Sequence, residues 1–192
     1  MNKITSILSY LPRVYRFKIY KYEIKKEEIK IKGIEVRPIT FENVGDIAWW
    51  DKSKVKYYTQ LLKEGNMGLY VYCDGRVVAH AWGLIVDIQK YKKIRSSLLR
   101  IDVSVIVANC SVHENYRRRF FFNALLSEMV SKLNKNGYFN IYTDMVVDNE
   151  ASWRAFERIG FVHIENCLRF QIRNRILFNL KFNKNTSWFQ NK

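Results

Sequence analysis

The sequence predicts one α/β domain of the α+β kind, in which helices flank a mixed, mainly antiparallel central sheet. The first observation is Asp74-Gly75 between two alternating apolar runs, because this dipeptide is a strong signal for a hairpin turn. The second is an apolar run that ends near Val112 and leads through a basic turn into an amphipathic helix. The third is a further strand and short helix in residues 139–159. At 192 residues, the chain is long enough for one sizeable core.

The expected elements follow from local patterns, taken in chain order. Residues 1–33 form a basic N-terminal extension, in which period-two alternation over residues 16–24 indicates an extra strand. The main domain spans residues 34–182, and residues 183–192 form a polar tail. The elements of the main domain are strand 34–39, a helix to residue 50, a helix to residue 63, strands 69–73, 76–86 and 103–112, a helix to residue 136, strand 139–147, helix 149–159, and strands 161–173 and 176–182.

The net charge of +15 narrows the classes of partner. Such a charge attracts polyanions, anionic membrane surfaces or phosphorylated ligands. Basic residues are spread through residues 13–32 and 169–192 instead of forming one block, which also fits an ordinary solvated surface. This spread argues against a nucleic-acid binder, whose charge clusters on one face with aromatic residues interleaved. Peripheral contact with an anionic surface stays open.

Cysteines and apolar runs indicate the compartment. The three cysteines have no metal-ligand spacing, so we expect reduced thiols and no metal site. No apolar run approaches the length of a membrane-spanning helix. Residues 4–11 lack a signal-peptide cleavage site. A cytoplasmic protein is therefore expected, and the pattern leaves an oligomer open.

Residues 112–126 combine a strand end, a basic turn and a helix start. The first amides of a helix have no intrahelical partner, and the helix dipole is positive there, so such a corner binds anions. Further along, residues 149–161 read Asn-Glu-Ala-Ser-Trp-Arg-Ala-Phe-Glu-Arg-Ile-Gly-Phe, with Asn149 placed to cap a short helix. These two segments are the most informative part of the sequence.

In this order, and between these strands, the two segments resemble the GNAT superfamily of acetyl-CoA-dependent N-acetyltransferases. The resemblance covers roughly residues 34–173 and implies a GNAT-like fold. The first segment carries Val-x-x-x-Tyr-Arg followed by a helix. The second segment matches Asn-x-Ala-Ser-x-x-x-Phe-Glu-Arg-x-Gly-Phe at Asn149, Ala151, Ser152, Phe156, Glu157, Arg158, Gly160 and Phe161.

The resemblance implies acetyl-CoA as co-substrate and assigns its parts to residues. Backbone groups near Cys110 and Val112 would bond the pantetheine arm. Asn123 would open the helix after the turn, and Asn149 would cap the second helix and face the arm. Phe156 stands where relatives commonly have a tyrosine, whose phenol can protonate the departing thiolate. The turn that would hold the pyrophosphate contains Arg117, Arg118, Arg119, Phe120 and Phe122.

Two phenylalanines stand where the family usually has glycines. The family's turn reads Arg/Gln-x-x-Gly-x-Gly/Ala, whereas here Phe120 and Phe122 occupy the glycine positions. Glycine lets a backbone approach a phosphate and adopt unusual dihedral angles. The three arginines could offset its loss through charge-assisted contacts. Two hypotheses stay open, namely retained CoA binding, or a domain that kept the fold and binds something else.

Acetyl transfer requires a neutral amine near the thioester and a donor for the oxyanion. The candidate bases are Asp144 and His80, with His113 and Glu114 at the turn. Each has a structural alternative. His80 between two alanines fits a packed, hydrogen-bonded core residue, Asp144 fits an ion pair with a lysine or arginine, and the other two fit solvent exposure.

The function that the sequence favours is transfer of an acetyl group to a primary amine of a small molecule or sugar-type metabolite. One alternative is a non-catalytic GNAT-fold binding domain with a degenerate phosphate turn. Another is a basic binder of nucleic acid or an anionic surface. The aromatic pairs Trp49-Trp50 and Tyr57-Tyr58 either pack in the core or form walls of an acceptor pocket.

Overall fold

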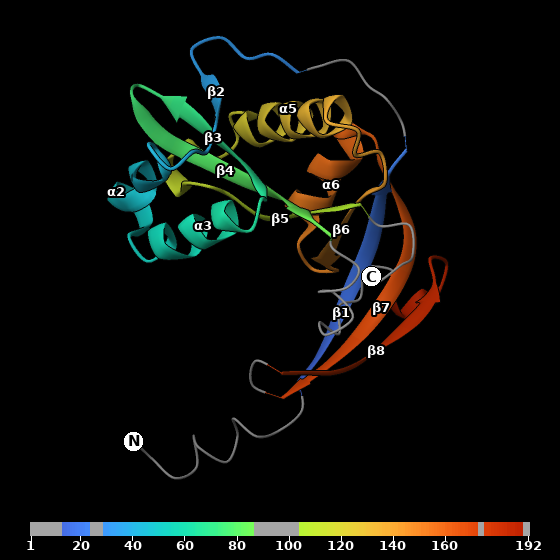
Figure 1. The fold of residues 1–192 in the computed structure, drawn as a ribbon. Coiled ribbons are helices and arrows are strands. Elements are labelled where there is room, and N and C mark those ends of the chain that lie inside the picture. Colours follow the sequence, from blue (N-terminus) through green and yellow to red (C-terminus); the bar gives the residue numbers. More distant parts are fainter. Residues whose placement is uncertain (1–12, 24–28, 87–103, 173–174, 190–192) are drawn as a thin grey trace.

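The computed structural model describes residues 13–23, 29–86, 104–172 and 175–189. The expectation of no signal peptide at residues 4–11 lies outside the described residues, as do the predicted strand ends at residues 24, 103 and 173. Figure 1 shows helices packed around one part of the sheet, while β1, β7 and β8 extend beyond them. This arrangement separates a helix-covered half of the molecule from an extended arm.

In the described residues, one eight-stranded sheet has the order β2-β3-β4-β5-β6-β1-β7-β8. Neighbouring strands are antiparallel except β5 and β6, which run parallel. The predicted mixed, mainly antiparallel sheet is therefore confirmed. The strands are β1 (Arg13–Tyr22), β2 (Glu35–Pro38), β3 (Met67–Cys73), β4 (Arg76–Ile85), β5 (Val105–Val112), β6 (Ile141–Val146), β7 (Phe161–Ile172) and β8 (Arg175–Asn183).

Helices cover both faces of the sheet (Figure 1). On one face, α5 (Phe121–Lys135) and α6 (Glu150–Ile159) pack over a core that includes Leu125, Met129 and Leu133. On the other face, the helices contribute Ile47, Tyr58 and Leu61 to a core that contains Trp82 of β4. These helices are η1 (Val44–Ile47), α2 (Ala48–Asp51) and α3 (Lys54–Lys63).

The helix expected to end at residue 50 is divided into the 3₁₀ turn η1 and the short helix α2. Asn43 explains its late start. The Asn43 Oδ1 atom accepts from the Thr40 amide at 2.8 Å, and Nδ2 donates to the Pro38 carbonyl at 2.9 Å. These bonds hold the chain in a turn, because an asparagine side chain competes with helical backbone bonds.

The N-terminal strand lies inside the sheet. β1 pairs with β6 on one side and with β7 on the other, and it spans Arg13–Tyr22, a shift from the predicted residues 16–24. Ile19 and Tyr20 point to opposite faces, and both are fully buried. Residues of the expected N-terminal extension thus contribute to the same sheet as the main domain.

The predicted hairpin of β3 and β4 is confirmed, and its turn explains the sequence. Asp74 and Gly75 both have positive φ angles, 50° and 75°, as a two-residue type I′ turn requires. Further along β4, Gly83 allows close packing of α5. A Cβ atom there would lie 3.2 Å from a Leu133 methyl and 3.3 Å from a Val105 methyl. A glycine inside a strand often marks such a close approach, and Gly83 is an example.

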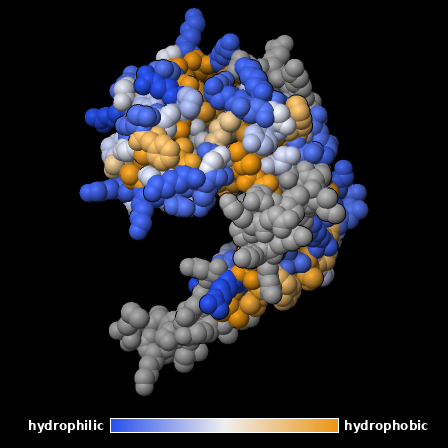
Figure 2. Space-filling model, in the orientation of Figure 1, coloured by the Kyte–Doolittle hydropathy of each residue, from blue (hydrophilic) through white to orange (hydrophobic). Residues whose placement is uncertain are grey.

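The arm formed by β1, β7 and β8 leaves apolar side chains exposed. Figure 2 shows hydrophobic surface along this arm. Val14, Phe178 and Leu180 are each about half exposed, and Phe178 stacks on Phe170 with ring centroids 4.3 Å apart. β8 pairs only with β7 among the described strands. Exposed apolar surface of this kind accompanies association in many proteins, so oligomer formation stays a prediction.

Candidate functional site

β5 and β6 lie side by side only at their beginnings. Val105 pairs with Ile141 and Ile106 with Tyr142, after which β5 continues along β4 while β6 continues along β1. The Thr143 hydroxyl donates to the Val107 carbonyl at 2.9 Å, close to the point of divergence. Beyond it, the outer edge of β5 has no described strand beside it. Backbone N–H and C=O groups on such an edge can bond a ligand.

A bulge interrupts β5 just after the divergence. His80 of β4 pairs with Ser111 and Trp82 pairs with Ala108, so two residues of β5 lie opposite one residue of β4. Asn109, the first of these two, has a φ angle of 49° in the left-handed region. Cys110 is the second. The bulge bends this part of β5. Cys110 in the bulge and Val112 after it are only partly buried.

The basic turn connects the end of β5 to α5. A short 3₁₀ helix, η2 (Glu114–Tyr116), precedes three exposed arginines. Arg117 Nε donates to the Val112 carbonyl at 3.4 Å, and the Arg119 guanidinium lies 5.3 Å from the centre of the Tyr116 ring. α5 begins directly afterwards, at Phe121. Cationic side chains and the first amides of a long helix therefore lie together, an arrangement that suits an anion.

Of the two phenylalanines at glycine positions, only Phe120 needs an unusual backbone. Phe120 has φ 59° and ψ 8°, whereas Phe122 lies in the first turn of α5. Left-handed backbone costs a residue with a Cβ about 1–2 kcal/mol. The Phe120 side chain is 60% exposed, and the Arg158 guanidinium lies 5.9 Å from its ring centre. Phe122 packs against Phe156 at 5.8 Å.

Replacing Phe120 with glycine is expected to stabilise the protein by about 1 kcal/mol, because relief of the left-handed strain exceeds the added entropy of the unfolded chain. The change also uncovers the backbone of the turn, so acetyl-CoA should bind more tightly. The matched variant Phe122→Gly should destabilise the protein, since it places glycine in a helix and removes the contact with Phe156. Urea unfolding and calorimetric titration of both variants provide the measurement. Stability shifts of the same sign would contradict this account.

The second segment holds α6 against the start of α5. The Asn149 side chain accepts from the Ser152 amide at 3.3 Å, so the predicted cap is formed. Asn123 is not the residue that opens α5, because Phe120 in the left-handed conformation sets the start of the helix. Asn123 is instead buried within the first turn and donates to the Ala155 carbonyl at 3.5 Å. Phe156 is buried between Phe122 and Phe161.

Asp144 of β6 is held in an ion pair. Its Oδ2 atom lies 2.7 Å from the Arg169 guanidinium, with only 22% of the Asp144 side chain and 16% of the Arg169 side chain exposed. Arg169 also lies 4.1 Å from the centre of the Phe17 ring. The structural alternative from the sequence, a pair with a basic residue, is thus observed. Asp144 of β6 and His80 of β4 lie on strands separated by β5, so the two candidate bases do not form a couple.

Replacing Asp144 with asparagine is expected to lower the free energy of unfolding by about 1 kcal/mol, because Arg169 loses its carboxylate in a partly buried site. The turnover of an active enzyme should change less than threefold. Asp148→Asn is the matched control, since its pair with Arg16 is more exposed and should matter less. Urea unfolding and steady-state kinetics give both quantities. A loss of turnover above 100-fold with normal folding would identify Asp144 as a catalytic group.

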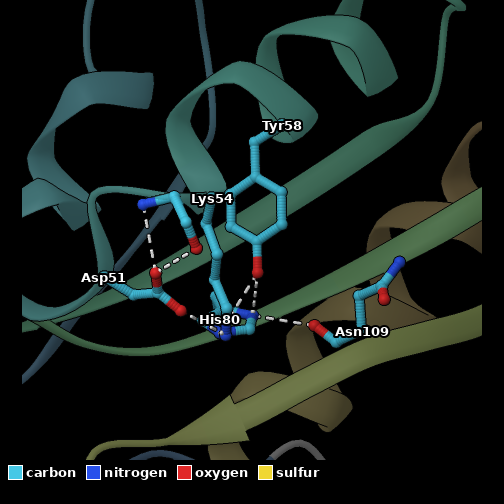
Figure 3. Close-up of polar contacts among 6 residues, drawn as sticks. Asp51, Lys54, Tyr58, His80 and Asn109 are labelled. Atoms are coloured by element: carbon cyan, nitrogen blue, oxygen red, sulfur yellow. Dashed lines mark hydrogen bonds and ion pairs between the residues drawn. The ribbon is translucent and has the colours of Figure 1, made fainter. Parts of the chain in front are cut away.

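His80 lies at the centre of a polar network between α3 and the β5 bulge (Figure 3). Its Nδ1 atom is 2.7 Å from the Asn109 carbonyl oxygen, and its Nε2 atom is 3.4 Å from Lys54 Nζ. The Tyr58 hydroxyl lies 3.0 Å and 3.2 Å from the two ring nitrogens. Asp51 Oδ2 lies 3.6 Å from Lys54 Nζ. The network therefore extends from a partly exposed carboxylate to a buried imidazole.

The environment keeps His80 neutral. Its exposed fraction is 1%. Burial first, and the nearby Lys54 ammonium second, lower the pKa of His80 from 6.5 to about 4, although the hydrogen bond with Asn109 acts in the opposite direction. Burial likewise raises the pKa of the Tyr58 hydroxyl. Sequence reasoning named His80 but missed Tyr58 and Lys54 as its partners. Their i, i+4 spacing, which places both on one helix face, is the available signal.

Aromatic side chains surround the approach to this network. Trp49 stacks on His113 with ring centroids 4.8 Å apart, and Trp50 lies 5.2 Å from the His80 ring. The Tyr57 hydroxyl accepts from the Asn109 amide at 3.0 Å. Trp49 and Tyr57 are about half exposed. The aromatic pairs thus contribute both to the core and to the surface beside the bulge. Glu114 is exposed, as expected, but the solvent exposure expected of His113 is wrong, because its ring is partly buried against Trp49 and Trp50.

The described residues contain no group of three or more His, Cys, Asp and Glu side chains that could hold a metal ion. In the same part of the chain, no helix combines the length and the apolar character needed to cross a membrane.

Comparison with known proteins identifies a related family. The sequence model of the acetyltransferase (GNAT) family matches residues 34–161. No curated protein matches the sequence. Among solved structures, an acetyltransferase of the GNAT family from Colwellia psychrerythraea is similar, with a TM-score of 0.62, 13% identity, and coverage of 84% of this chain and 57% of that chain.

Two further structures have ligands or acceptors in their names. AAC(6')-Iy, in complex with the bisubstrate analogue CoA-S-monomethyl-acetylneamine, has a TM-score of 0.53 and 15% identity over 68% of this chain and 91% of that chain. The ribosomal-protein-S18-alanine N-acetyltransferase from Escherichia coli has a TM-score of 0.52 and 16% identity over 67% and 77%. The chain spans 57% to 65% of the length of three other similar structures. At these identities the likeness establishes the fold.

Proposed function

Because the chain belongs to the GNAT acetyltransferase family, we propose that it transfers an acetyl group from acetyl-CoA to a primary amine of a small molecule or sugar-type metabolite. The observation that carries this proposal is the basic turn at the N-terminus of α5, located directly after the diverging end of β5. One end of this arrangement suits a diphosphate, and the other suits an extended amide-containing arm.

The outer edge of β5 supports binding of the pantetheine arm. An extended ligand with amide groups can bond a free strand edge as another strand would. Beyond the pair of Ile106 and Tyr142, β5 has such an edge, which includes Cys110 and Val112. Arg117 already donates to the Val112 carbonyl. We expect the arm to use the remaining backbone groups around Cys110.

The turn supports binding of the pyrophosphate. Three arginines and the first amides of α5 lie next to each other, and the net charge of +15 attracts an anionic ligand over longer distances. Phe120 carries a side chain where the family usually has a glycine, so we expect the arginines to carry a larger share of the binding here. Asn149, as the cap of α6, keeps that helix in position beside α5. Asn123 contributes through its bond to the Ala155 carbonyl.

In the reaction, the amine nitrogen attacks the thioester carbon, the C–N bond forms, and the C–S bond breaks to release the thiolate of CoA. The amine loses one proton and the thiolate gains one. Phe156 has no hydroxyl to donate a proton, and the Asp144 carboxylate is engaged by Arg169. We expect water to carry the proton between the two. The enzyme contributes orientation and electrostatic stabilisation, which can supply most of the rate increase.

Aromatic side chains beside the bulge support a role in acceptor binding. Tyr57 exposes ring surface next to Asn109, and Trp49 exposes ring surface beside His113. Such rings bind the apolar part or the cationic group of an amine. An acceptor panel should include aminosugars, polyamines, aromatic amines and a peptide with an N-terminal alanine. The peptide tests a protein acceptor, as named for the Escherichia coli structure.

Isothermal titration with acetyl-CoA and with desulfo-CoA tests the proposal. We expect micromolar binding of both ligands. With acetyl-CoA, addition of an accepted amine should then release the free thiol of CoA. Absence of binding at millimolar ligand, by protein with a normal circular dichroism spectrum, would rule out the enzyme. That result would favour the non-catalytic binding domain, for which the left-handed Phe120 is the supporting observation.

A further inference from the structure

We propose that His80 is a positioning residue, which holds the bulge of β5 through a hydrogen bond from its Nδ1 to the Asn109 carbonyl and thereby shapes the edge that binds the pantetheine arm. The catalytic consequence of this role rests on the proposed function. The hydrogen bond and the shape of the bulge can be tested even if the protein binds no acetyl-CoA.

The first argument is the hydrogen bonding of the bulge itself. Asn109 and Cys110 have no Cα partner in β4, because His80 pairs with Ser111 and Trp82 with Ala108. A bulge leaves backbone groups without ladder partners, and unpaired polar groups near the core are costly. The His80 ring lies 2.7 Å from the Asn109 carbonyl. A side chain thus takes the place of a missing ladder bond.

The second argument is the conformation of Asn109. Asn109 has a left-handed backbone, which asparagine adopts more readily than most residues other than glycine. Here two hydrogen bonds hold Asn109, one through its backbone carbonyl and one through its side chain. Its carbonyl bonds His80 of β4, and its side-chain amide donates to the Tyr57 hydroxyl of α3 at 3.0 Å. Figure 3 shows His80 between α3 and Asn109, so it connects the helix layer to the bulge.

The third argument concerns the protonation of the ring. Lys54 Nζ can only donate, and it lies 3.4 Å from Nε2, so Nε2 accepts and the proton resides on Nδ1. The Tyr58 hydroxyl, 3.2 Å from Nε2 and 3.0 Å from Nδ1, can donate to Nε2 and can share the proton on Nδ1. Burial favours the neutral ring. His80 is therefore a steady donor toward Asn109, and its basic nitrogen is directed toward α3, away from the edge of β5.

These positions distinguish a positioning role from a general base. A base needs a free nitrogen within reach of the amine. His80 uses Nδ1 for the bulge, Nε2 faces Lys54, and the Tyr58 hydroxyl lies within 3.2 Å of both nitrogens. Loss of the Nδ1 donor should let the bulge relax and misplace Cys110. The first kinetic constant to change should then be the KM for acetyl-CoA.

Three variants distinguish the roles of the two ring nitrogens of His80. The His80→Asn amide places a donor near the position of Nδ1, His80→Gln places one near Nε2, and His80→Ala has neither. We expect His80→Asn to bind acetyl-CoA within threefold of the wild type, and His80→Gln and His80→Ala to bind at least tenfold more weakly. His163→Asn is the matched control. This half-buried histidine of β7 bonds the Asn166 side chain and the Glu165 carbonyl, and its replacement should leave binding unchanged.

Nitrogen NMR of the imidazole in the wild-type protein adds a readout that does not depend on activity. We expect the Nδ1–H tautomer and a shift of the amide signals of Asn109 and Cys110 in His80→Ala. An Nε2–H tautomer would overturn the proposal. Equal losses of turnover in all three variants, together with loss of the acidic limb of the pH profile, would overturn it in favour of a base. If the wild type binds no acetyl-CoA, the proposed function fails, whereas the tautomer and the amide shifts still decide the role of His80.

Discussion

Replacing Arg117, Arg118 and Arg119 together with alanine is expected to weaken acetyl-CoA binding by about 100-fold. A hydrogen bond to a charged group contributes about 1.5 kcal/mol or more, and two such bonds to the phosphates amount to about 3 kcal/mol, or about two factors of ten. Arginine suits this task because its planar fork binds a phosphate in a bidentate manner. The loss should be large here, since we expect Phe120, in place of the usual glycine, to limit the contribution of the backbone.

The matched control removes the same charge elsewhere. Lys52, Lys56 and Lys63 are exposed residues in and beside α3, and their triple alanine variant also reduces the net charge from +15 to +12. Titration calorimetry at two salt concentrations compares both variants with the wild type. Only the arginine variant should lose most of its affinity for acetyl-CoA, and only in that variant should this affinity become nearly independent of the salt concentration. Unchanged binding in the arginine variant would show that the turn does not hold the pyrophosphate.

Lowering the pH from 7 to 5 is expected to reduce the free energy of unfolding by about 2 kcal/mol through His80. In the folded state, burial and Lys54 lower the pKa of His80 to about 4, against 6.5 for the free group. Between these values the unfolded state binds more protons, so stability rises with pH. The contribution is fully present above the pKa of the unfolded state. It is lost progressively as the pH falls toward the folded value.

Urea unfolding at the two pH values measures this change, and His80→Asn is the variant that removes it. The variant should be about 2 kcal/mol less sensitive to the change in pH than the wild type. Burial also lowers the pKa of His163, so His163→Asn serves as the comparison for a second, half-buried histidine. Equal sensitivity of wild type and His80→Asn would show that His80 is accessible to protons in the folded state.

Local chemistry made several features predictable from the sequence. The turn at Asp74 and Gly75 needs only two residues that tolerate positive φ, and the cap at Asn149 needs only a short polar side chain at a helix start. The order of strands and helices around the two matched segments predicted the fold class and the family, which the structure and the family match confirm. These features depend on neighbours along the chain, so the sequence alone carries them.

The tertiary structure decided what depends on residues far apart in the chain. β1 lies between β6 and β7, where Ile19 on one face and Tyr20 on the other are both buried. A period-two sequence pattern indicates a strand but cannot show which strands lie beside it. The partner of Asp144 is Arg169, and that of His80 is the Asn109 carbonyl.

The basic turn combines both kinds of information. Its arginines and its position before a helix are visible in the sequence, and they determined the expectation of an anion site. Only the folded chain showed that Phe120 adopts the left-handed conformation while Phe122 does not. Only the folded chain placed the bulge of β5 against His80. The sequence determined which groups are present, and the tertiary structure decided which of them meet, because pairing across strands and layers sets both backbone strain and hydrogen-bond partners.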